Sequence, residues 1–343
     1  MLDPNRKLAL YAQATMGQLN AKMTEGIIHY GRNPVAAVID SRAAGRTVGD
    51  LCGFDSEVPI VATLDEALAL GSEVFVLGTA PSGGRIPPDW MAVLRAAVDA
   101  GMSLVNGLHD PLNPLFDHHL KQGQWIWDIR TPVGDMPPIA AARAARLPNK
   151  RVLMIGTDMA IGKMTAGLEI YRALRDRGAN VVFLATGQVG VSIMGSGIPL
   201  DAFRVDHASG AVERMVMEAA DHDIQIIEGQ GSLLHPGSTA TLPLMRGSCC
   251  NAMILCHRAG MEYLDTFDDV RIPPLGDVIK LNEMTASANQ ALTEAKVAGI
   301  ALNTRDLGEA EAKAEIARLQ GETGLPVTDP VRFGAGVLAD CVL

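Results

Sequence analysis

The segment RVLMIGTDMAIGKMT, residues 151–165, decides the fold of the second half of this chain. It begins with an apolar run typical of a buried strand, passes through a glycine-containing turn and enters an amphipathic helix expected over 163–177. A strand, such a loop and a helix form a P-loop, in which backbone N–H groups and a helix N-terminus surround a phosphate and a lysine adds charge. The segment therefore predicts a phosphate-binding set, which consists of Gly156, Thr157, Asp158, Gly162, Lys163 and Thr165.

Two positions depart from the GxxxxGK[ST] pattern. Gly156 comes one residue too early, as in the similar G-T-D-x-x-x-G-K segment of dethiobiotin synthetase-like proteins. Met164 stands where a hydroxyl residue usually ligates Mg²⁺, and Thr165, the next residue, faces about 100° away on the helix. The segment thus predicts phosphate binding and disfavours Mg²⁺-dependent ATP chemistry.

Apolar runs alternate with helix-like segments along most of the chain. In the first half, strands are expected at 34–40, 59–62, 74–79 and 103–107, with a helix at about 88–100. In the second half, strands are expected at 151–155, 180–185, 224–227, 252–256, 278–281 and 297–302, with helices at 163–177, about 210–220 and 308–320. This alternation predicts an α/β protein: an N-terminal Rossmann-like parallel-sheet domain followed by a P-loop NTPase-like α/β domain.

The stretch 131–149 separates the two series. It carries four prolines and the basic, alanine-rich run AARAARLPNK. Prolines in this number predict a domain boundary here, with one domain at 1–147 and the other at 148–343. The alternative interpretation is a short interdomain helix.

Composition narrows the class of protein. The chain has 343 residues, 48% hydrophobic and 20% charged, with a net charge of −10, which supports packed domains and disfavours nucleic acid or an anionic membrane as a partner. The N-terminal sequence lacks an apolar signal core, and no apolar run reaches the roughly 18 residues that cross a bilayer. Five irregularly spaced cysteines include no CxxC pair. We expect a cytoplasmic protein with no metal site, and we expect residues 265–269 to be solvated surface.

Polar residues follow several of the expected strands, at the edge where open parallel sheets bind ligands. Glu228 is a candidate metal ligand, general base or anchor for loop N–H groups, and His235 is a candidate for proton transfer. Arg85 follows two glycines and could hold a carboxylate bidentately. The candidate substrate-binding residues are Arg85, His109, Arg130 and Gln188.

Taken together, these motifs resemble those of the DgcN family over nearly the whole chain. The matching segments are AVIDS (37–41), GTAPSGGR (78–85), NGLH (106–109), the P-loop, ATGQ (185–188) and EGQGS (228–232) with His235-Pro236. The resemblance implies a Rossmann-like domain joined to a P-loop domain. It also implies D-glutamate N-acetyltransferase activity with acetyl-CoA, alongside an enolase-type epimerase or racemase in D-amino-acid breakdown. Val189 replaces the threonine found in the family.

The leading hypothesis is therefore transfer of an acetyl group from acetyl-CoA to the α-amine of an acidic amino acid, with D-glutamate the first candidate. Glu228 and His235 are the candidate catalytic residues, and the glycine loops could stabilise the oxyanion. An ATP- and Mg²⁺-dependent ligase or kinase of the dethiobiotin synthetase type is the alternative. A non-catalytic nucleotide-sensing protein is the third hypothesis, and a homo-oligomer is expected from base rates.

Overall fold

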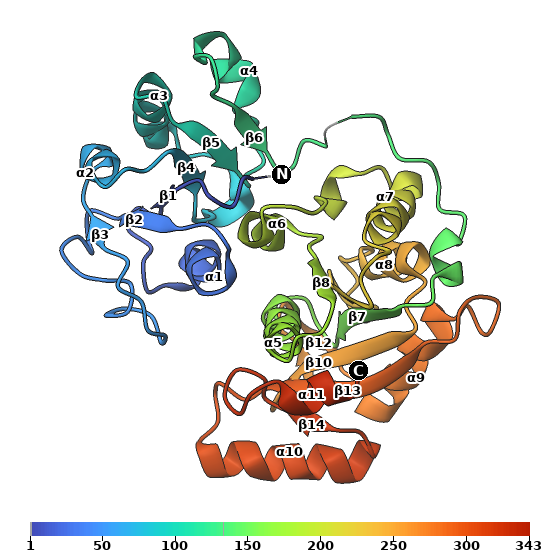
Figure 1. The fold of residues 1–343 in the computed structure, drawn as a ribbon. Helices are drawn as coiled ribbons and strands as arrows, with labels where there is room; N and C mark the ends of the chain where they lie inside the picture. The colour runs from blue at the N-terminus through green and yellow to red at the C-terminus, as the bar shows by residue number, and fades with distance from the viewer. Residues whose placement is uncertain (1, 133) are drawn as a thin grey trace. The chain divides into compact units, whose positions relative to one another are not determined.

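The computed structural model describes residues 2–132 and 134–343, which fold into two compact units (Figure 1). The first unit comprises Met1–Val133 and Gly187–Ala202, and the second comprises Gly134–Thr186 and Phe203–Leu343. Each unit is built on a six-stranded sheet whose neighbouring strands are all parallel, which confirms the predicted α/β class. The sequence analysis assigned residues 187–202 to the second domain, whereas they pack with the first unit.

The sheet of the first unit has the strand order β3-β2-β1-β4-β5-β6. Its strands are β1 (Leu8–Tyr11), β2 (Val35–Ile39), β3 (Ile60–Val61), β4 (Val74–Leu77), β5 (Ser103–Asn106) and β6 (Ile126–Asp128). This is the order of a doubly wound Rossmann sheet, in which the direction of winding reverses between β1 and β4. All four residues of β1, β4 and β5 are buried, as expected for strands covered on both faces.

The helices of the first unit form its core with the sheet. They are α1 (Lys22–Tyr30), α2 (Leu64–Ala69), α3 (Met91–Asp99), α4 (Asn113–Phe116) and α6 (Gln188–Met194). Phe75, Leu94, Leu104 and Phe116 belong to one apolar cluster under α2, α3 and α4. Helix α6 packs against α1, where a Cβ on Gly26 would lie 2.6 Å from Ile193 Cδ1. A glycine on α1 therefore lets the returning segment 187–202 approach closely.

The sheet of the second unit has the order β14-β13-β10-β7-β9-β8. Its strands are β7 (Lys150–Gly156), β8 (Val181–Leu184), β9 (Ile224–Ile227), β10 (Ala252–Arg258), β13 (Lys296–Asn303) and β14 (Val327–Thr328). Strand β7 lies between β9 and β10, so the loops that follow these three strands meet at one edge of the sheet. A short antiparallel hairpin, β11 (Tyr263–Leu264) and β12 (Phe267–Arg271), follows β10.

The helices of the second unit are α5 (Lys163–Asp176), α7 (Val205–Glu218), α8 (Thr241–Ser248), α9 (Leu275–Ala286), α10 (Glu309–Thr323) and α11 (Gly336–Asp340). Helix α5 packs on β7, β8 and β9 and contacts α11, whereas α8 contacts β7, α7 and α9. The strand predicted at 278–281 is wrong, because these residues lie inside α9. Val278 and Asn282 are buried there and Leu281 is exposed, which is the spacing of a helix face.

No helix in residues 2–132 and 134–343 is both long enough and apolar enough to cross a membrane.

The connector at the start of the second unit is held against α7. Backbone N–H groups of Ala141 and Arg143, and Nε of Arg143, donate hydrogen bonds to the fully buried carboxylate of Glu213. Burial alone would raise the pKa of Glu213, but the hydrogen bonds from Arg143 and Ala141 hold it below its ordinary value. The only helical turn in this connector, within the described part of the chain, is a 3₁₀ turn at Arg143–Arg146.

Gly210 lies on α7 where the connector crosses it, and a Cβ there would stand 1.6 Å from the carbonyl oxygen of Pro138. We expect Gly210→Ala to destabilise the second unit by about 2 kcal/mol despite the better helix propensity of alanine, because the connector must move. Urea unfolding followed by circular dichroism measures the change. Gly321→Ala on α10 is the matched control, since a Cβ there meets open space, and it should stabilise by about 0.5–1 kcal/mol. Equal effects of the two substitutions would contradict the close contact.

Candidate functional site

The loop between β7 and α5 forms a P-loop in the second unit. Helix α5 begins at Lys163, and Gly162 caps it with a left-handed φ of 109°, which a residue with a Cβ adopts only at a cost. A Cβ on Gly156 would lie 2.8 Å from Ile161 Cδ1 and 3.1 Å from Lys163 Cδ. The two glycines of the predicted motif thus permit the turn and the close path of the lysine side chain.

Lys163 is only 4% exposed, although it carries a charge. Its Nζ donates hydrogen bonds to the carbonyl oxygens of Asp158 at 2.6 Å and Met159 at 2.7 Å. Because an ammonium group has three donors, one remains for a ligand. Burial lowers the pKa of Lys163 to about 8, against the opposing effect of the Asp158 and Glu228 carboxylates. A bound phosphate would favour the charged form of this lysine.

Asp158 joins the P-loop to the β11–β12 hairpin. Its Oδ1 accepts a hydrogen bond from Met159 N at 2.6 Å, and its Oδ2 accepts one from Asp265 N at 2.8 Å. Asp265 also forms an ion pair with Arg258 at the end of β10. The segment 265–269 is exposed, as predicted for solvated surface, but its first residue fixes a candidate site residue. This contact could not be predicted from the sequence, because it is made by a backbone N–H group.

Glu228 follows β9 and is 3% exposed. Its Oε2 accepts a hydrogen bond from Thr186 N at 2.7 Å, while Thr186 Oγ1 donates to Glu228 O at 2.8 Å. The next residue, Gly229, passes so close to β7 that a Cβ would lie 1.7 Å from Met154 O. Of the three roles considered for Glu228, its contact with Thr186 N supports the anchoring of loop N–H groups.

His235 is 6% exposed and is held on both ring nitrogens. Gly237 N donates to Nδ1 at 3.1 Å, and Nε2 lies 3.1 Å from Thr266 Oγ1. Because Nδ1 accepts, the neutral ring carries its proton on Nε2 and donates it to Thr266. The ring also forms a T-shaped contact with Phe267, with the ring centroids 5.1 Å apart. The hydrogen bond from Gly237 N therefore determines the tautomer of His235, and the hydroxyl of Thr266, a residue of the hairpin, accepts from Nε2.

A second histidine, which the sequence analysis did not single out, supports the P-loop from β10. Thr157 Oγ1 lies 3.0 Å from His257 Nδ1, and both side chains are buried. Burial lowers the pKa of His257 to about 4, so the ring is neutral near pH 7. Thr157 is thus hydrogen-bonded within the protein through its side chain.

A cavity of about 440 Å³ opens beside the P-loop. Gly162 and Thr165 line one side, Asn303 is the last residue of β13, and Arg305 and Arg332 belong to the loops after β13 and β14. The predicted residue Thr165 thus faces a space in which a ligand larger than a phosphate fits. The cavity residues after β13 and β14 were not predicted, because no motif in the sequence marks them.

The four candidate substrate-binding residues, Arg85, His109, Arg130 and Gln188, lie in the first unit at one edge of its sheet. Arg85 follows β4 and pairs with Asp110, and His109 follows β5, its N–H donating to Gly84 O at 2.8 Å. Arg130 follows β6, donates from Nε to Gly107 O at 2.9 Å and pairs with Asp201.

These side chains lie within electrostatic reach of one another. The positive charge of Arg130, followed by burial and by Arg85, lowers the pKa of His109. Gln188 begins α6 next to the same loop, since a Cβ on Gly107 would lie 3.5 Å from Gln188 Cβ. The four substrate-binding candidates therefore form one polar cluster.

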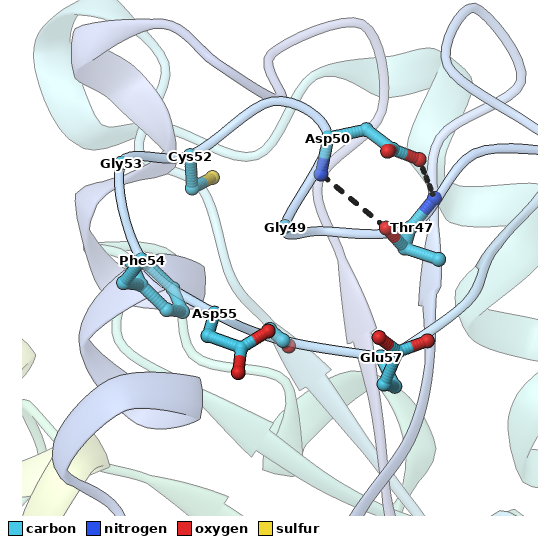
Figure 2. Close-up of a pocket in the computed structure, with 9 residues that line it drawn as sticks. Thr47, Gly49, Asp50, Cys52, Gly53, Phe54, Asp55 and Glu57 are labelled. Atoms are coloured by element: carbon cyan, nitrogen blue, oxygen red, sulfur yellow. Dashed lines mark hydrogen bonds between the residues drawn. The ribbon is translucent and has the colours of Figure 1, made fainter.

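Another hollow of the first unit is formed by the loop around residues 47–57, shown in Figure 2. Its lining includes the acidic side chains of Asp50, Asp55 and Glu57, and Asp50 accepts a hydrogen bond from Thr47 N at 2.7 Å. None of the candidate site residues lines this hollow. Its negative charge disfavours an anionic ligand, so it contributes nothing to the candidate site.

The chain is similar to several known proteins. It is 36% identical over 284 residues to a D-glutamate N-acetyltransferase of Tritonibacter scottomollicae, which covers 82% of this chain and 84% of that protein. It is 34% identical over 273 residues to a D-glutamate N-acetyltransferase of a Pseudoalteromonas species, covering 78% and 81%. The crystal structure of a DUF1611 family protein from Anabaena variabilis superposes with a TM-score of 0.92 at 48% identity, over 98% of this chain and 99% of that one.

Two family descriptions match the two halves. Residues 41–132 match the DUF1611 N-terminal Rossmann-like domain, and residues 138–339 match the DUF1611 C-terminal P-loop domain. These matches and the names of the relatives confirm the family resemblance predicted from the motifs. The chain belongs to the DUF1611 family, whose members join a Rossmann-like domain to a P-loop domain.

Proposed function

We propose that the protein is an N-acetyltransferase that moves the acetyl group of acetyl-CoA to the α-amine of an acidic amino acid, with D-glutamate the first candidate. The observation that carries the proposal is a P-loop with a buried lysine but without the usual Mg²⁺-binding hydroxyl. It occurs in a chain 36% identical to a protein named D-glutamate N-acetyltransferase. We place the reaction in cytoplasmic D-amino-acid catabolism and expect a homo-oligomer.

The P-loop suits a coenzyme that is bound rather than cleaved at its phosphates. Backbone N–H groups and the N-terminus of α5 provide partial positive charge, and Lys163 provides a full charge that is only partly used by its own loop. Met164 has no oxygen for Mg²⁺, which would handicap ATP cleavage but not the holding of a pyrophosphate.

The proposed reaction forms a bond between the amine nitrogen and the acetyl carbon and breaks the carbon–sulfur bond, so that CoA leaves as a thiol. A base must remove a proton from the amine. In the hydrogen-bond arrangement described, the Nδ1 of His235 accepts from Gly237 and its Nε2 carries the proton, which suits hydrogen-bond donation better than proton removal. An ionised carboxylate only accepts hydrogen bonds and protons, so Glu228, which is buried directly after β9, is the preferred candidate base.

Arg85 and Arg130 are proposed to bind the two carboxylates of the acceptor. Each guanidinium pairs with a carboxylate of its own unit, Asp110 or Asp201, which a substrate carboxylate would have to replace or join. The charge of Arg130, burial and the charge of Arg85 lower the pKa of His109, which favours its neutral ring, and this ring could hydrogen-bond the substrate, as could Gln188. Bidentate pairing with arginine is the geometry that carboxylates favour.

Thiol release from acetyl-CoA tests the reaction, with D-glutamate and L-glutamate as parallel acceptors and EDTA present. We expect release that depends on one isomer and is insensitive to EDTA. Glu228→Gln, which keeps an oxygen for Thr186 N, should lower kcat by about 10²–10⁴-fold with little change in the KM for acetyl-CoA. His235→Gln should have a smaller effect on kcat.

Absence of thiol release with either isomer, together with Mg²⁺-dependent ATP hydrolysis when acceptors are screened, would overturn the proposal in favour of the ATP-dependent ligase or kinase. Binding of nucleotide without any turnover would favour the sensing protein.

The buried ammonium of Lys163 makes a second prediction. Its pKa is about 8 in the free protein, and a bound phosphate should raise it, so binding above pH 8 must take up a proton. The affinity for acetyl-CoA should therefore be constant below about pH 8 and fall by up to about tenfold per pH unit above it. Calorimetric titration from pH 7 to 9.5 measures this slope, and acetyl-CoA is used because its thioester has no titrating thiol.

Lys163→Met is the matched control, since it keeps a long apolar stem and removes the charge. It should bind acetyl-CoA more weakly with no pH dependence in this window. A slope that persists in the Lys163→Met protein would assign the proton uptake to another group.

A further inference from the structure

The cavity beside the P-loop has apolar walls and a charged rim. Ile161, Ala166, Leu302, Pro330 and Val331 form much of its lining, with Gly162 and Thr165 at the phosphate-binding end. At about 440 Å³ it has the size and the mainly apolar character of a pocket for a planar ring system with a few polar groups around it. A nucleotide whose phosphates lie on the P-loop could place its base and ribose there.

Asp329 belongs to the lining, but its carboxylate is already fully engaged. Oδ2 accepts hydrogen bonds from Thr304 N at 2.9 Å and Thr304 Oγ1 at 2.6 Å, and Oδ1 accepts from Val331 N at 3.0 Å and Arg332 N at 3.1 Å. Asp329 therefore ties the loop after β14 to the loop after β13. In doing so it links the backbone of Arg332 to that of Thr304, the residue before Arg305.

The two arginines at the rim retain hydrogen-bond donors. Arg332 uses Nη1 alone, which donates to Leu307 O at 2.9 Å and, more weakly, to both oxygens of Thr304. Arg305 makes one long side-chain hydrogen bond, from Nε to Asp306 Oδ2 at 3.4 Å, and its side chain is 52% exposed. Within residues 2–132 and 134–343, the two Nη atoms of Arg305 and the Nε and Nη2 atoms of Arg332 have no hydrogen-bond partner.

From this geometry we infer that the cavity selects a 3′-phosphorylated adenine nucleotide, with the pyrophosphate on the P-loop and the 3′-phosphate on Arg305 and Arg332. Guanidinium groups with free donors are the preferred partners of a phosphate dianion. The inference rests on the proposed use of acetyl-CoA and extends it, because it names the part of the coenzyme that is recognised. ATP has a hydroxyl at the 3′ position and would leave both arginines without an anionic partner.

Coenzyme A and dephospho-coenzyme A provide the test, since they share the pyrophosphate and differ in the 3′-phosphate alone. Calorimetric titration of the full chain should give an affinity for coenzyme A at least about tenfold higher than that for dephospho-coenzyme A. In Arg305→Gln and in Arg332→Gln, the ratio of the affinity for coenzyme A to that for dephospho-coenzyme A should fall. In the double variant this ratio should approach one. The affinity for dephospho-coenzyme A should change by less than about threefold in each variant.

Arg175→Gln is the matched control, because Arg175 lies in the last turn of α5, at the opposite end from Gly162, with a side chain 51% exposed. In this variant the ratio of the two coenzyme affinities should equal that of the unmodified protein. Equal affinities for the two coenzymes in the unmodified protein, or an unchanged ratio in the double variant, would overturn the inference. If Arg332→Gln fails to fold, Arg305→Gln alone decides, since Arg305 has just one weak side-chain contact.

The binding comparison of the two coenzymes and the thiol-release assay test the 3′-phosphate site and the acetyltransferase activity separately. Thiol release from acetyl-CoA with equal binding of the two coenzymes would overturn the 3′-phosphate site and leave the acetyltransferase standing. A preference for coenzyme A that is lost in the arginine variants, without thiol release to any acceptor, would support the site and overturn the acetyltransferase.

Discussion

The burial of one ammonium group, that of Lys163, is the constraint on which the P-loop unit depends. A lysine that is 4% exposed must find oxygen atoms, and it finds them in the carbonyl groups of Asp158 and Met159. Its stem runs where Gly156 and Gly229 have no side chain, because a Cβ on either would lie 3.1 Å from Lys163 Cδ. The backbone of the loops after β7 and β9 therefore passes close to the side chain of Lys163, which leaves no room for a Cβ at Gly156 or Gly229. The low pKa that results links ligand binding to proton uptake.

The carboxylates of Glu228, Asp158 and Asp329 accept hydrogen bonds from backbone N–H groups of the loops. Glu228 accepts from Thr186 N, Asp158 from Asp265 N, and Asp329 from N–H groups of two loops. The bonds from Thr186 N to Glu228, from Asp265 N to Asp158 and from Thr304 N to Asp329 join residues 42, 107 and 25 positions apart, so they tie the loops at this edge of the sheet to one another. These hydrogen bonds position the loop backbones that carry Lys163, Arg305 and Arg332, which favours the selection of one phosphate pattern over another.

Most strands and the P-loop could be predicted from the sequence, and the wrong predictions have identifiable causes. The run at 278–281 was predicted as a strand because a segment of four mainly apolar residues is too short to distinguish the period of a strand from that of a helix. The longer pattern of buried residues through Asn282 belongs to α9. Strands β1 and β6, the β11–β12 hairpin, and helices α1, α2, α4, α6, α8 and α11 were not predicted, although β1 is central in its sheet. The hairpin residues Asp265 and Thr266 looked like solvated surface, since their charge and polarity do not show that they hydrogen-bond Asp158 and His235.

The sequence by itself determined the two α/β halves, the phosphate-binding character of residues 156–165 and the residue types available at the strand ends, because local periodicity and glycine placement are written in neighbouring residues. Only the tertiary structure decided that Gly187–Ala202 packs with the first unit, that His235 carries its proton toward Thr266, and that a cavity with two arginines adjoins Gly162. These features depend on contacts between residues tens of positions apart. Their geometry follows from the packing of whole strands and helices, which no single stretch of sequence encodes.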